Sequence, residues 1–461
     1  MRWVTGFFLC LLASVAHAQY RPLTAQVAAN LGVTGYTIPA GFVGLSGEAV
    51  DLVTAGYYQG STGANGSYCS LVNLLGSTGS FRLGGNSSDL ATPPALTQGI
   101  ANNLNSFVSC LGANWKLIYG LNMRAANYSL AATQAGYIAT AFGGGANVVF
   151  QFGNEVLGGY LSKTAYQTAW NSEYSSVSGT VSPLTVAGPD SEDFGDVQNV
   201  IPNLTPGTPT IITQHWYGSY NSNPYTVTSA SQLISTVAIN YWVNAGLGSA
   251  TPPVGVNGNN AWIVQNGYTQ RMSESNSINS LGLTGFSNVM ASATWYLNQA
   301  IFLSNNSWVG INTHNTYTSA GVGIYNPIVS LDGGNTFQAA PEFYGLYLFS
   351  KIEGQQTVAV SVGGNANINA IATKGGNGNA NILAVNNDPF HPSIVTPSQS
   401  SAWTTANVLL FSGASCYDVA PTIGGAIIGP SGSWSGSSYA ISNGSTISIP
   451  PCGAALIQIQ P

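Results

Sequence analysis

Short apolar segments recur along the first two thirds of the chain, with longer stretches of helical spacing between them. Eight segments have the length and composition of strands: Gly41–Ser46, Ser80–Asn86, Lys116–Asn122, Asn147–Glu155, Thr185–Asp190, Thr210–Tyr217, Tyr268–Ser275 and Ser307–Asn315. The stretches between them include the candidate helices Thr133–Phe142, Thr164–Tyr174 and Asn288–Leu303. Alternating strands and helices are typical of parallel sheets with crossover helices, and eight such units over about 300 residues predict a (β/α)8 TIM barrel of the α/β class.

The pattern changes past about residue 350, where short alternating strands are broken by Gly, Asn, Ser and Pro. These strands include Thr357–Val362, Asn381–Asn386, Ala406–Ser412 and Ala454–Gln460. Such a pattern predicts a C-terminal β-sandwich. We therefore expect a catalytic barrel over residues 41–349 and a sandwich over 350–461, with residues 19–40 forming a strand that joins the sandwich.

The first 18 residues have the organisation of a cleavable signal peptide. Arg2 precedes the apolar run Phe7–Val15, and Ala16-His17-Ala18 forms a small-residue cleavage site before Gln19. The rest of the sequence has no charge-free apolar run of roughly 18 residues, the length that a membrane-spanning helix needs. We therefore expect a secreted or periplasmic protein with no membrane partner.

Charged residues are scarce, and this narrows the classes of partner. Only 5% of the 461 residues are charged and 44% are hydrophobic, so the chain can bury a large core. Nine Lys and Arg in total form no basic stripe, which argues against nucleic acid as a partner. The polarity comes instead from Gly, Ser, Thr and Asn, a composition suited to a neutral or weakly acidic carbohydrate.

The cysteines predict disulfides and no metal site. With Cys10 inside the signal peptide, Cys69, Cys110, Cys416 and Cys452 remain, an even number in an exported chain. Three pairings are possible, and we favour Cys69–Cys110 and Cys416–Cys452 because each closes a local loop of roughly 40 residues. The spacing matches no zinc site.

Polar and aromatic side chains gather where the predicted barrel strands end. Because the carboxyl ends of parallel strands meet at one end of a barrel, these side chains should form one pocket. Hydrogen-bonding groups and aromatic faces are what a sugar requires. The candidate substrate contacts are Asp89, Asn122, His215, Tyr217 and His314. Either histidine could instead be structural, and Arg82 is more simply explained as a buried partner of carboxylates beneath the pocket.

Two carboxylates stand out among only 15 acidic residues. Glu155 and Glu274 each follow an apolar run, on the fourth and seventh predicted strands. Cleavage of a glycosidic bond requires such a pair, one group to protonate the leaving oxygen and one to attack the anomeric carbon. A single Glu at a strand end is more often a loop residue, but two matched segments favour catalysis. Arg271 lies three residues before Glu274 on an alternating strand, so we expect it to face away from that carboxylate.

Seven segments together resemble one known family. They are Gly41-Phe-Val-Gly-Leu-Ser46, Phe81-Arg-Leu-Gly-Gly-Asn-Ser87, Tyr119-Gly-Leu-Asn122, Phe152-Gly-Asn-Glu155, Arg271-Met-Ser-Glu274 with Asn276-Ser277, Gly310-Ile-Asn-Thr-His314 and Pro341-Glu-Phe-Tyr-Gly345. Because these segments occur in this order, the sequence resembles the family 79 glycoside hydrolases, which contain β-glucuronidases and heparanase. The resemblance covers most of the chain and implies catalytic carboxylates after barrel strands four and seven.

The resemblance also implies roles for individual residues. Glu155 would be the general acid/base, Asn154 the neighbour that contacts the sugar 2-hydroxyl, and Glu274 the nucleophile of a retaining double displacement. Tyr325 resembles a contact to the sugar carboxylate in uronate-specific members. No metal or organic cofactor is implied. The sequence departs from the family pattern at Ser277-Ile-Asn-Ser280, which lacks the aromatic residue that many members have after the nucleophile.

Three functions remain open from the sequence. The first is a secreted retaining β-glycosidase, in particular a β-glucuronidase acting on β-linked glucuronic acid or a derivative. The second is a glycosidase of the same clan that acts on a neutral sugar or an internal polysaccharide bond. The third is a non-catalytic carbohydrate-binding or adhesion protein, against which the presence of Glu155, Glu274 and Asn154 argues. The oligomeric state is left open.

Overall fold

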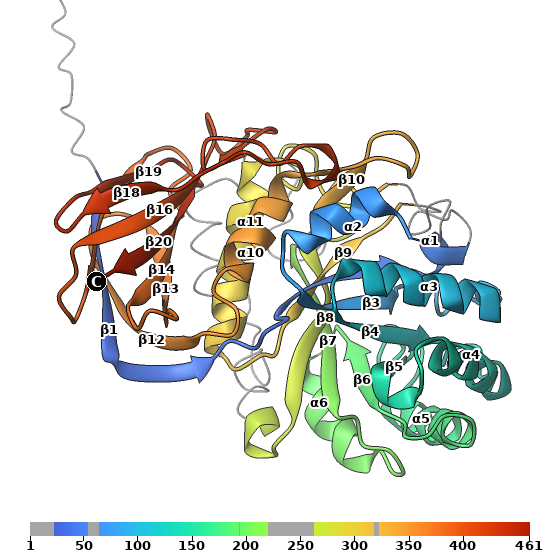
Figure 1. Ribbon diagram of the computed structural model, residues 1–461. Helices are drawn as coiled ribbons and strands as arrows, with labels where there is room; N and C mark the ends of the chain where they lie inside the picture. Colours follow the sequence, from blue (N-terminus) through green and yellow to red (C-terminus); the bar gives the residue numbers. More distant parts are fainter. Residues whose placement is uncertain (1–22, 54–63, 193, 220–261, 318–321) are drawn as a thin grey trace, which may run out of the picture.

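The computed structural model describes residues 23–53, 64–192, 194–219, 262–317 and 322–461 (Figure 1). The predicted signal peptide, residues 1–18, lies outside the described residues. Within them, no helix has both the length and the apolar character needed to cross a membrane.

Eight parallel strands close into a barrel in which each strand pairs with its neighbours in chain order. The strands are β2 (Val43–Glu48), β3 (Thr78–Gly84), β4 (Asn114–Leu121), β5 (Val148–Phe152), β6 (Val186–Ser191), β7 (Ile211–Ser219), β8 (Thr269–Ile278) and β9 (Ile311–Asn315). Closure comes from β2 and β9, which pair from Val43 opposite Ile311 to Gly47 opposite Asn315. Each strand predicted from the sequence overlaps one of these eight, and the predicted TIM barrel with a separate sheet domain is confirmed.

Helices surround the barrel, as Figure 1 shows. Their bounds are α1 (Ala49–Val53), α2 (Gly66–Asn73), α3 (Gln98–Leu111), α4 (Tyr128–Ala141), α5 (Lys163–Ser178), α6 (Phe194–Val200), α10 (Met290–Asn305) and α11 (Pro341–Ser350), with short 3-10 turns at η1 (Gly145–Asn147), η2 (Ile201–Asn203) and η3 (Pro430–Gly432). A small hairpin of β10 (Ile328–Ser330) and β11 (Phe337–Ala339) lies between β9 and α11.

Polar caps fix where these helices begin. The side chains of Asn127 and Ser162 accept hydrogen bonds from backbone N–H groups in the first turns of α4 and α5. A capping side chain satisfies a donor that the helix itself leaves free. Both helices therefore begin earlier than the apolar spacing alone predicted.

The second domain is one hydrogen-bonded sheet. Its strands are β1 (Leu23–Thr37), β12 (Gln356–Gly364), β13 (Ile368–Lys374), β14 (Ala380–Asn386), β15 (Ser393–Gln399), β16 (Thr405–Ser412), β17 (Thr422–Ile423), β18 (Tyr439–Ser442), β19 (Ile447–Ile449) and β20 (Ala454–Gln460). The order is β17-β16-β20-β14-β13-β12-β1-β15-β19, with β18 on β16. Apolar residues from most of these strands, among them Val27, Ile382 and Ile457, form a second core.

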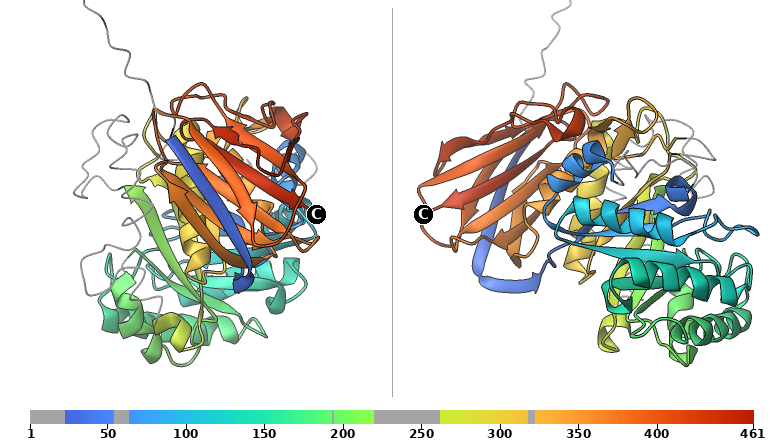
Figure 2. Two further views of the ribbon diagram at one scale, coloured as in Figure 1. Left: turned by 90° about the vertical axis from the view of Figure 1, so that its left-hand side faces the viewer. Right: turned by 45° about the vertical axis from the view of Figure 1, so that its right-hand side comes forward.

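Strand β1 lies inside this sheet although it begins the described chain. It pairs antiparallel with β12 and parallel with β15. In Figure 2 the strand crosses the sheet among segments from the end of the chain.

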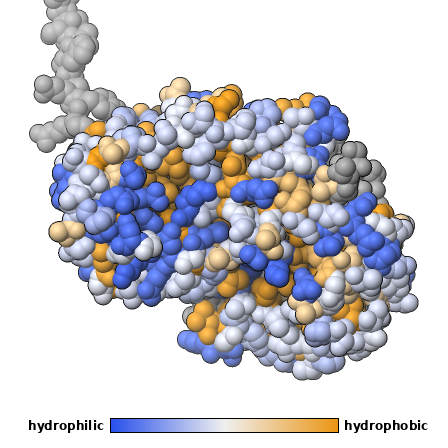
Figure 3. All heavy atoms as spheres, viewed as in Figure 1, coloured by the Kyte–Doolittle hydropathy of each residue, from blue (hydrophilic) through white to orange (hydrophobic). Residues whose placement is uncertain are grey.

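Two helices connect the domains. Figure 1 shows α10 and α11 between the barrel and the sheet, and both are almost wholly buried. The backbone N–H groups of Met290 and Ala291 donate to the carbonyls of Asp418 and Cys416. Hydrophilic side chains cover much of the sheet domain on the face seen in Figure 3, whereas apolar ones form smaller groups.

Two disulfides are present. Cys69 in α2 is bonded to Cys110 in α3, and Cys416 is bonded to Cys452 in the sheet domain. The second bond lies against α10, because the carbonyl of Cys452 accepts a hydrogen bond from the hydroxyl of Thr294 at 2.5 Å.

Candidate active site

A cavity of about 460 Å³ opens at the carboxyl end of the barrel strands. Glu155 and Glu274 both line it, as do the predicted sugar contacts Tyr217, His314 and Tyr325. The remaining lining residues are Glu48, Asn86, Ser87, Leu90, Glu192, Asn279, Ser280, Leu281 and Thr316. The barrel topology therefore brings residues between Glu48 and Tyr325 together around one cavity.

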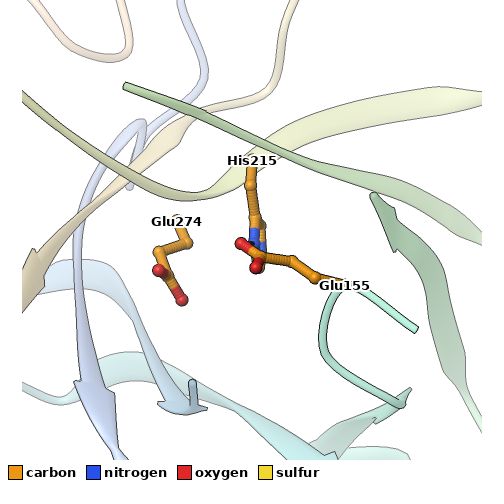
Figure 4. A group of neighbouring side chains, drawn as sticks. All are labelled: Glu155, His215 and Glu274. Atoms are coloured by element: carbon orange, nitrogen blue, oxygen red, sulfur yellow. Dashed lines mark hydrogen bonds and ion pairs between the residues drawn. The ribbon is translucent and has the colours of Figure 1, made fainter. Parts of the chain in front are cut away.

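The two predicted catalytic carboxylates face each other across this hollow. One oxygen of Glu155, one of Glu274 and one ring nitrogen of His215 all lie within 4.8 Å of one another. Figure 4 shows the three side chains pointing toward one another. Glu274 lies on β8, and Glu155 follows β5 in a tight turn in which Gly153 has φ +77°.

The turn after β5 needs its glycine. A Cβ atom at Gly153 would lie 2.6 Å from a methyl carbon of Val156, closer than real Cβ contacts come. Glu155 itself has φ +54°, and its N–H donates to the carbonyl of Asp190 at 2.9 Å. The ends of β5 and β6 thereby fix the backbone that carries Glu155.

Arg82 on β3 holds the floor of the cavity together. Its Nη1 donates to Glu274 Oε2 at 2.5 Å, and its Nη2 donates to Asp190 Oδ2 and Asn154 Oδ1, both at 2.6 Å. The guanidinium is completely buried. This is the arrangement that the sequence suggested for Arg82, a buried cation that organises carboxylates from below.

His215 links Glu155 to Asp190. Its Nδ1 lies 2.7 Å from Glu155 Oε1 and its Nε2 lies 2.8 Å from Asp190 Oδ2. Burial disfavours a charged imidazole, but Asp190 and Glu274 outweigh this effect and raise the pKa of His215 to about 10. Both ring nitrogens therefore carry hydrogen at neutral pH and donate to the side-chain oxygens of Glu155 and Asp190.

The protonation of His215 bears on whether the site could hold a metal. Glu155, His215 and Glu274 are close enough to bind one ion. A histidine ligand must offer a nitrogen lone pair, however, and both nitrogens of His215 already face carboxylates. The donor set fits a proton-transfer site better than a metal site.

Glu274 is held in its ionised form. The Tyr217 hydroxyl donates to Glu274 Oε1 at 2.6 Å. Burial opposes ionisation, but the charges of His314, His215 and Arg82, together with this hydrogen bond, place the pKa of Glu274 well below its usual value. The carboxylate is thus available as an anion over a wide pH range.

A third carboxylate, Glu48, lines the same cavity and was not singled out from the sequence. It ends β2 and accepts hydrogen bonds from the Ser87 N–H at 2.8 Å and the Asn86 N–H at 3.3 Å. His314 Nε2 lies 3.5 Å from it. Burial opposes ionisation here too, but His314 and Ser87 lower the pKa of Glu48. The sequence signal that could have identified Glu48 was its position just after the predicted strand Gly41–Ser46.

The remaining predicted contacts lie beside or beneath the cavity. Asn154, Asp89 and His215 are buried, and the Asn154 N–H donates to the Asp89 carboxylate. The Asn122 amide donates to the Leu90 carbonyl at 2.7 Å and accepts from the Ala125 N–H at 2.9 Å. None of these four is among the described residues that line the cavity. In the structure they hold loops and carboxylates in place, and their direct contact with a sugar stays a prediction.

Strand β8 contains a bulge that the alternation argument did not anticipate. Gln214 pairs with Met272 and His215 with Glu274, so Ser273 is the extra residue. The Ser273 hydroxyl donates to Asp190 and thus reaches the same buried cluster as Glu274. Arg271 does face away from the nucleophile candidate, since it donates to Asn312 Oδ1 and to the carbonyls of Gly41 and Phe42.

Comparison with known proteins gives structural but not sequence matches. No protein-family model matches the chain, and no curated protein matches its sequence. Among solved structures, a 4-O-α-L-rhamnosyl-β-D-glucuronidase from Fusarium oxysporum is 13% identical, with a TM-score of 0.68, over 94% of this chain and 100% of the other. A GH51 arabinofuranosidase from Xanthomonas axonopodis pv. citri is 12% identical, with a TM-score of 0.69, over 95% and 100%. A family 44 xyloglucanase from Paenibacillus polymyxa is 12% identical, with a TM-score of 0.59, over the same shares.

Identities of 12–13% establish the fold that these proteins share with this chain, and the resemblance to family 79 stays a prediction. What the comparisons show is that the chain has the architecture of these barrel enzymes along nearly its whole length.

Proposed function

We propose that the chain is a retaining glycoside hydrolase in which Glu274 is the nucleophile and Glu155 the general acid/base. The observation that carries the proposal is the pair of carboxylates facing each other across the cavity, with oxygens within 4.8 Å. Retaining enzymes separate their two carboxyl groups by about 5–5.5 Å, and inverting enzymes by about 6.5–9.5 Å to admit a water. The glycosidases that share the fold support the same reaction class.

In the first step Glu274 attacks the anomeric carbon as the glycosidic C–O bond breaks. Glu155 gives its proton to the departing oxygen, and the sugar is left esterified to Glu274. Arg82 and Tyr217 hold the Glu274 carboxylate in the orientation required for attack. His215 and the Asp190 carbonyl orient Glu155.

In the second step water attacks the anomeric carbon and Glu155 accepts its proton. The ester bond to Glu274 breaks, the sugar leaves with its original configuration, and both carboxyl groups return to their starting states. The reaction requires no metal or organic cofactor, because the two carboxyl groups supply all the proton transfer and the covalent step.

For the substrate we propose a β-linked glucuronic acid or a derivative of it. Tyr325, for which the family resemblance implies a contact to the sugar carboxylate, lies on the cavity wall, and its ring centroid is 6.3 Å from that of Tyr217. One protein of the same fold is a glucuronidase. The predicted signal peptide and the two disulfides support export from the cytoplasm.

One observation favours a neutral sugar as the second candidate. Glu48 lines the cavity as an anion, and no Lys or Arg is among the described residues that line it. A carboxylate accepts hydrogen bonds from sugar hydroxyls but repels a uronate carboxylate placed beside it. A neutral glycone would therefore suit the part of the cavity next to Glu48.

A panel of nitrophenyl glycosides tests both candidates. Release of nitrophenol from the β-glucuronide, β-galacturonide, β-glucoside, β-xyloside and α-arabinofuranoside gives the order of kcat/KM. We expect the glucuronide to rank first, and a neutral sugar in first place would support the second candidate. Hydrolysis of none of them would favour a carbohydrate-binding protein without catalysis.

The nucleophile has its own test. Glu274→Gly should lose at least about 10³-fold in kcat and regain activity with added azide, which forms a glycosyl azide of inverted configuration. Glu274→Gln, which keeps the shape of the side chain, should be equally inactive but gain nothing from azide. Ordinary turnover by Glu274→Gly would show that Glu274 is not the nucleophile.

The acid/base role is tested by the leaving group. Glu155→Ala should retain its first step with a dinitrophenyl glycoside, whose leaving group departs without a proton, and should lose it with an alkyl glycoside. Equal losses with both leaving groups would contradict the assignment of Glu155.

A further inference from the structure

A second hollow adjoins the cavity on the side of Glu155. Its volume is about 440 Å³, and Glu155, Leu157, Gly158, Gly159, Tyr160 and Glu192 line it. Glu155 and Glu192 line both hollows, so the two spaces meet at the proposed acid. In the proposed reaction the acid contacts the oxygen of the leaving group, and the leaving group must therefore continue past Glu155.

An aromatic ring projects from the wall of this second hollow. Tyr160 is 55% exposed, a large fraction for an aromatic side chain. The Arg124 guanidinium lies over its ring, 3.7 Å from the centroid. This contact covers one part of the ring and holds its orientation, while much of the side chain stays accessible.

The loop that carries Tyr160 is built compactly against the proposed acid. The N–H groups of Tyr160 and Leu161 both donate to the Val156 carbonyl, at 3.1 and 2.9 Å. A Cβ atom at Gly159 would lie 2.8 Å from the Glu155 carbonyl oxygen, so only glycine allows this approach. The position of the ring relative to Glu155 is thereby fixed by the backbone.

The backbone of Arg124 is also linked by hydrogen bonds to the segment before Glu155, through its main-chain N–H group. The Asp89 carboxylate accepts from the Arg124 N–H at 3.5 Å and from the Asn154 N–H. The ends of β3, β4 and β5 are thus tied together at Asn154, the residue before Glu155. The backbone next to Glu155 is therefore fixed by hydrogen bonds to neighbouring strand ends.

The residues that line the second hollow indicate which kind of leaving group it can bind. Tyr160 offers an aromatic surface for the C–H face of a sugar ring, and Glu192 offers an acceptor for its hydroxyls. Two carboxyl groups line the hollow, whereas the Arg124 guanidinium contacts the Tyr160 ring and is not among the described residues that line the hollow. This disfavours an anionic leaving group and suits an uncharged one.

We propose that the second hollow is the leaving-group site of the enzyme and that it binds a neutral sugar, which stacks on Tyr160 and donates a hydroxyl hydrogen bond to Glu192. This inference rests on the proposed glycosidase function. It makes the substrate a di- or oligosaccharide rather than a glycoside of a small alcohol.

The test compares substrates that share a glycone and differ in the leaving group. The glycone is the one that the nitrophenyl panel ranks first, presented as the glycosyl fluoride, which has no leaving sugar, and as the disaccharide with glucose. Tyr160→Ala should lower kcat/KM for the disaccharide about tenfold, equivalent to about 1.4 kcal/mol, and leave the fluoride within about twofold. Tyr160→Phe, which keeps the ring, and Tyr439→Ala, an exposed tyrosine of the sheet domain, are the matched controls.

Equal effects of Tyr160→Ala on both substrates, or no effect on either, would overturn the proposal while leaving the glycosidase function standing. If the wild-type protein hydrolyses no substrate of the panel, the function itself fails and this inference fails with it. The two failures are therefore distinguishable.

A second variant tests the polarity of the site without removing the ring. With the glycosyl fluoride as donor, glucose or glucuronate is added as acceptor, and the ratio of transfer product to hydrolysis product is measured. In transfer, an acceptor hydroxyl attacks the anomeric carbon and gives its proton to Glu155, while the ester bond to Glu274 breaks and frees the Glu274 carboxylate. The wild type should transfer to glucose at least about tenfold better than to glucuronate, and Glu192→Gln should narrow this preference. Equal transfer to both acceptors by the wild type would contradict a neutral-sugar site.

Discussion

The buried charged side chains of the candidate active site are grouped around Arg82. Arg82 contacts Glu274 and Asp190 directly, and His215 and His314 add two further groups that can be positive near these carboxylates. In a low-dielectric interior such charges are tolerated only when paired and hydrogen-bonded. In a chain with nine Lys and Arg, the placement of Arg82 reflects the requirements of the site.

The sequence predicted part of this site and missed another part for a local reason. Glu155 and Glu274 were predictable because acidic residues are rare and both lie near the ends of predicted strands. Asp190 and Glu48 were not assigned, although each ends a strand. Asp190 reaches Arg82 through a backbone with φ +56°, and Glu155 has φ +54°. Such left-handed conformations decide where a side chain points and leave no periodic signal in a sequence.

Replacing Tyr217 tests the charge state of Glu274. In Tyr217→Phe the carboxylate loses a hydrogen bond to its charged form, so the pKa of Glu274 should rise. The acidic limb of kcat/KM, where Glu274 takes up a proton, should then move to higher pH by the same amount. Tyr344→Phe, which removes another buried hydroxyl that accepts from Ile428, should leave the limb in place. An unmoved limb in Tyr217→Phe would mean that the acidic limb reports another group.

At the scale of elements, strands were more predictable than helices. Each of the eight barrel strands overlaps a segment predicted from the sequence, although β8 (Thr269–Ile278) is largely polar. The helices begin at polar caps such as Asn127 and Ser162, outside the apolar spacing that marks the middle of a helix. The bulge at Ser273 likewise follows from pairing between β7 and β8, which is a long-range property.

Helix α11 carries a buried acid whose protonation should affect stability. Glu342 lies in its first turn and is completely buried, and burial raises its pKa well above the usual 4.5. Above pH 4.5 the unfolded chain loses this proton while the folded chain keeps it, so stability falls as pH rises. Glu342→Gln removes that dependence and should raise the free energy of unfolding at pH 7 by about 1–2 kcal/mol, with no gain at pH 4.

Urea unfolding at the two pH values measures this effect. Glu353→Gln is the control, because both Glu353 oxygens accept backbone hydrogen bonds, from Gly41 at 3.1 Å and Val43 at 2.6 Å. An amide offers only one such oxygen, so this variant should be less stable than the wild type at pH 4. The quantity to compare is the difference in unfolding free energy between Glu342→Gln and wild type. If this difference is no larger at pH 7 than at pH 4, buried protonated Glu342 does not explain the pH dependence.

At the scale of the whole molecule, the barrel and the sheet form a continuous structure. Helix α10 is buried between them, and backbone hydrogen bonds from its first residues reach Asp418 and Cys416. The Cys416–Cys452 bond closes the loop that receives them. The disulfide therefore stabilises the contact between the domains as well as the sheet itself.

Removing that disulfide should weaken the contact without altering the chemistry. The double variant Cys416→Ser, Cys452→Ser should lose about 2–4 kcal/mol of unfolding free energy, because its unfolded chain is no longer cross-linked. Its kcat at 25 °C should stay within about twofold of wild type, since neither cysteine lines the cavity. Urea unfolding and initial rates measure the two quantities, and a large loss of kcat with unchanged stability would show a link to the active site that the structure does not explain.

The position of β1 sets the order in which the molecule can be assembled. This strand is synthesised before its partners β12 and β15, which lie more than 300 residues later in the chain, as the pairs Ala25–Gly364 and Leu23–Ser393 illustrate. Until the ribosome has made those partners, the backbone hydrogen-bonding groups on both edges of β1 stay unpaired. Unpaired strand edges can associate with other chains. During synthesis β1 should therefore stay unpaired until β12 and β15 have been made, and a chaperone that shields β1 in that interval should raise the yield of folded protein.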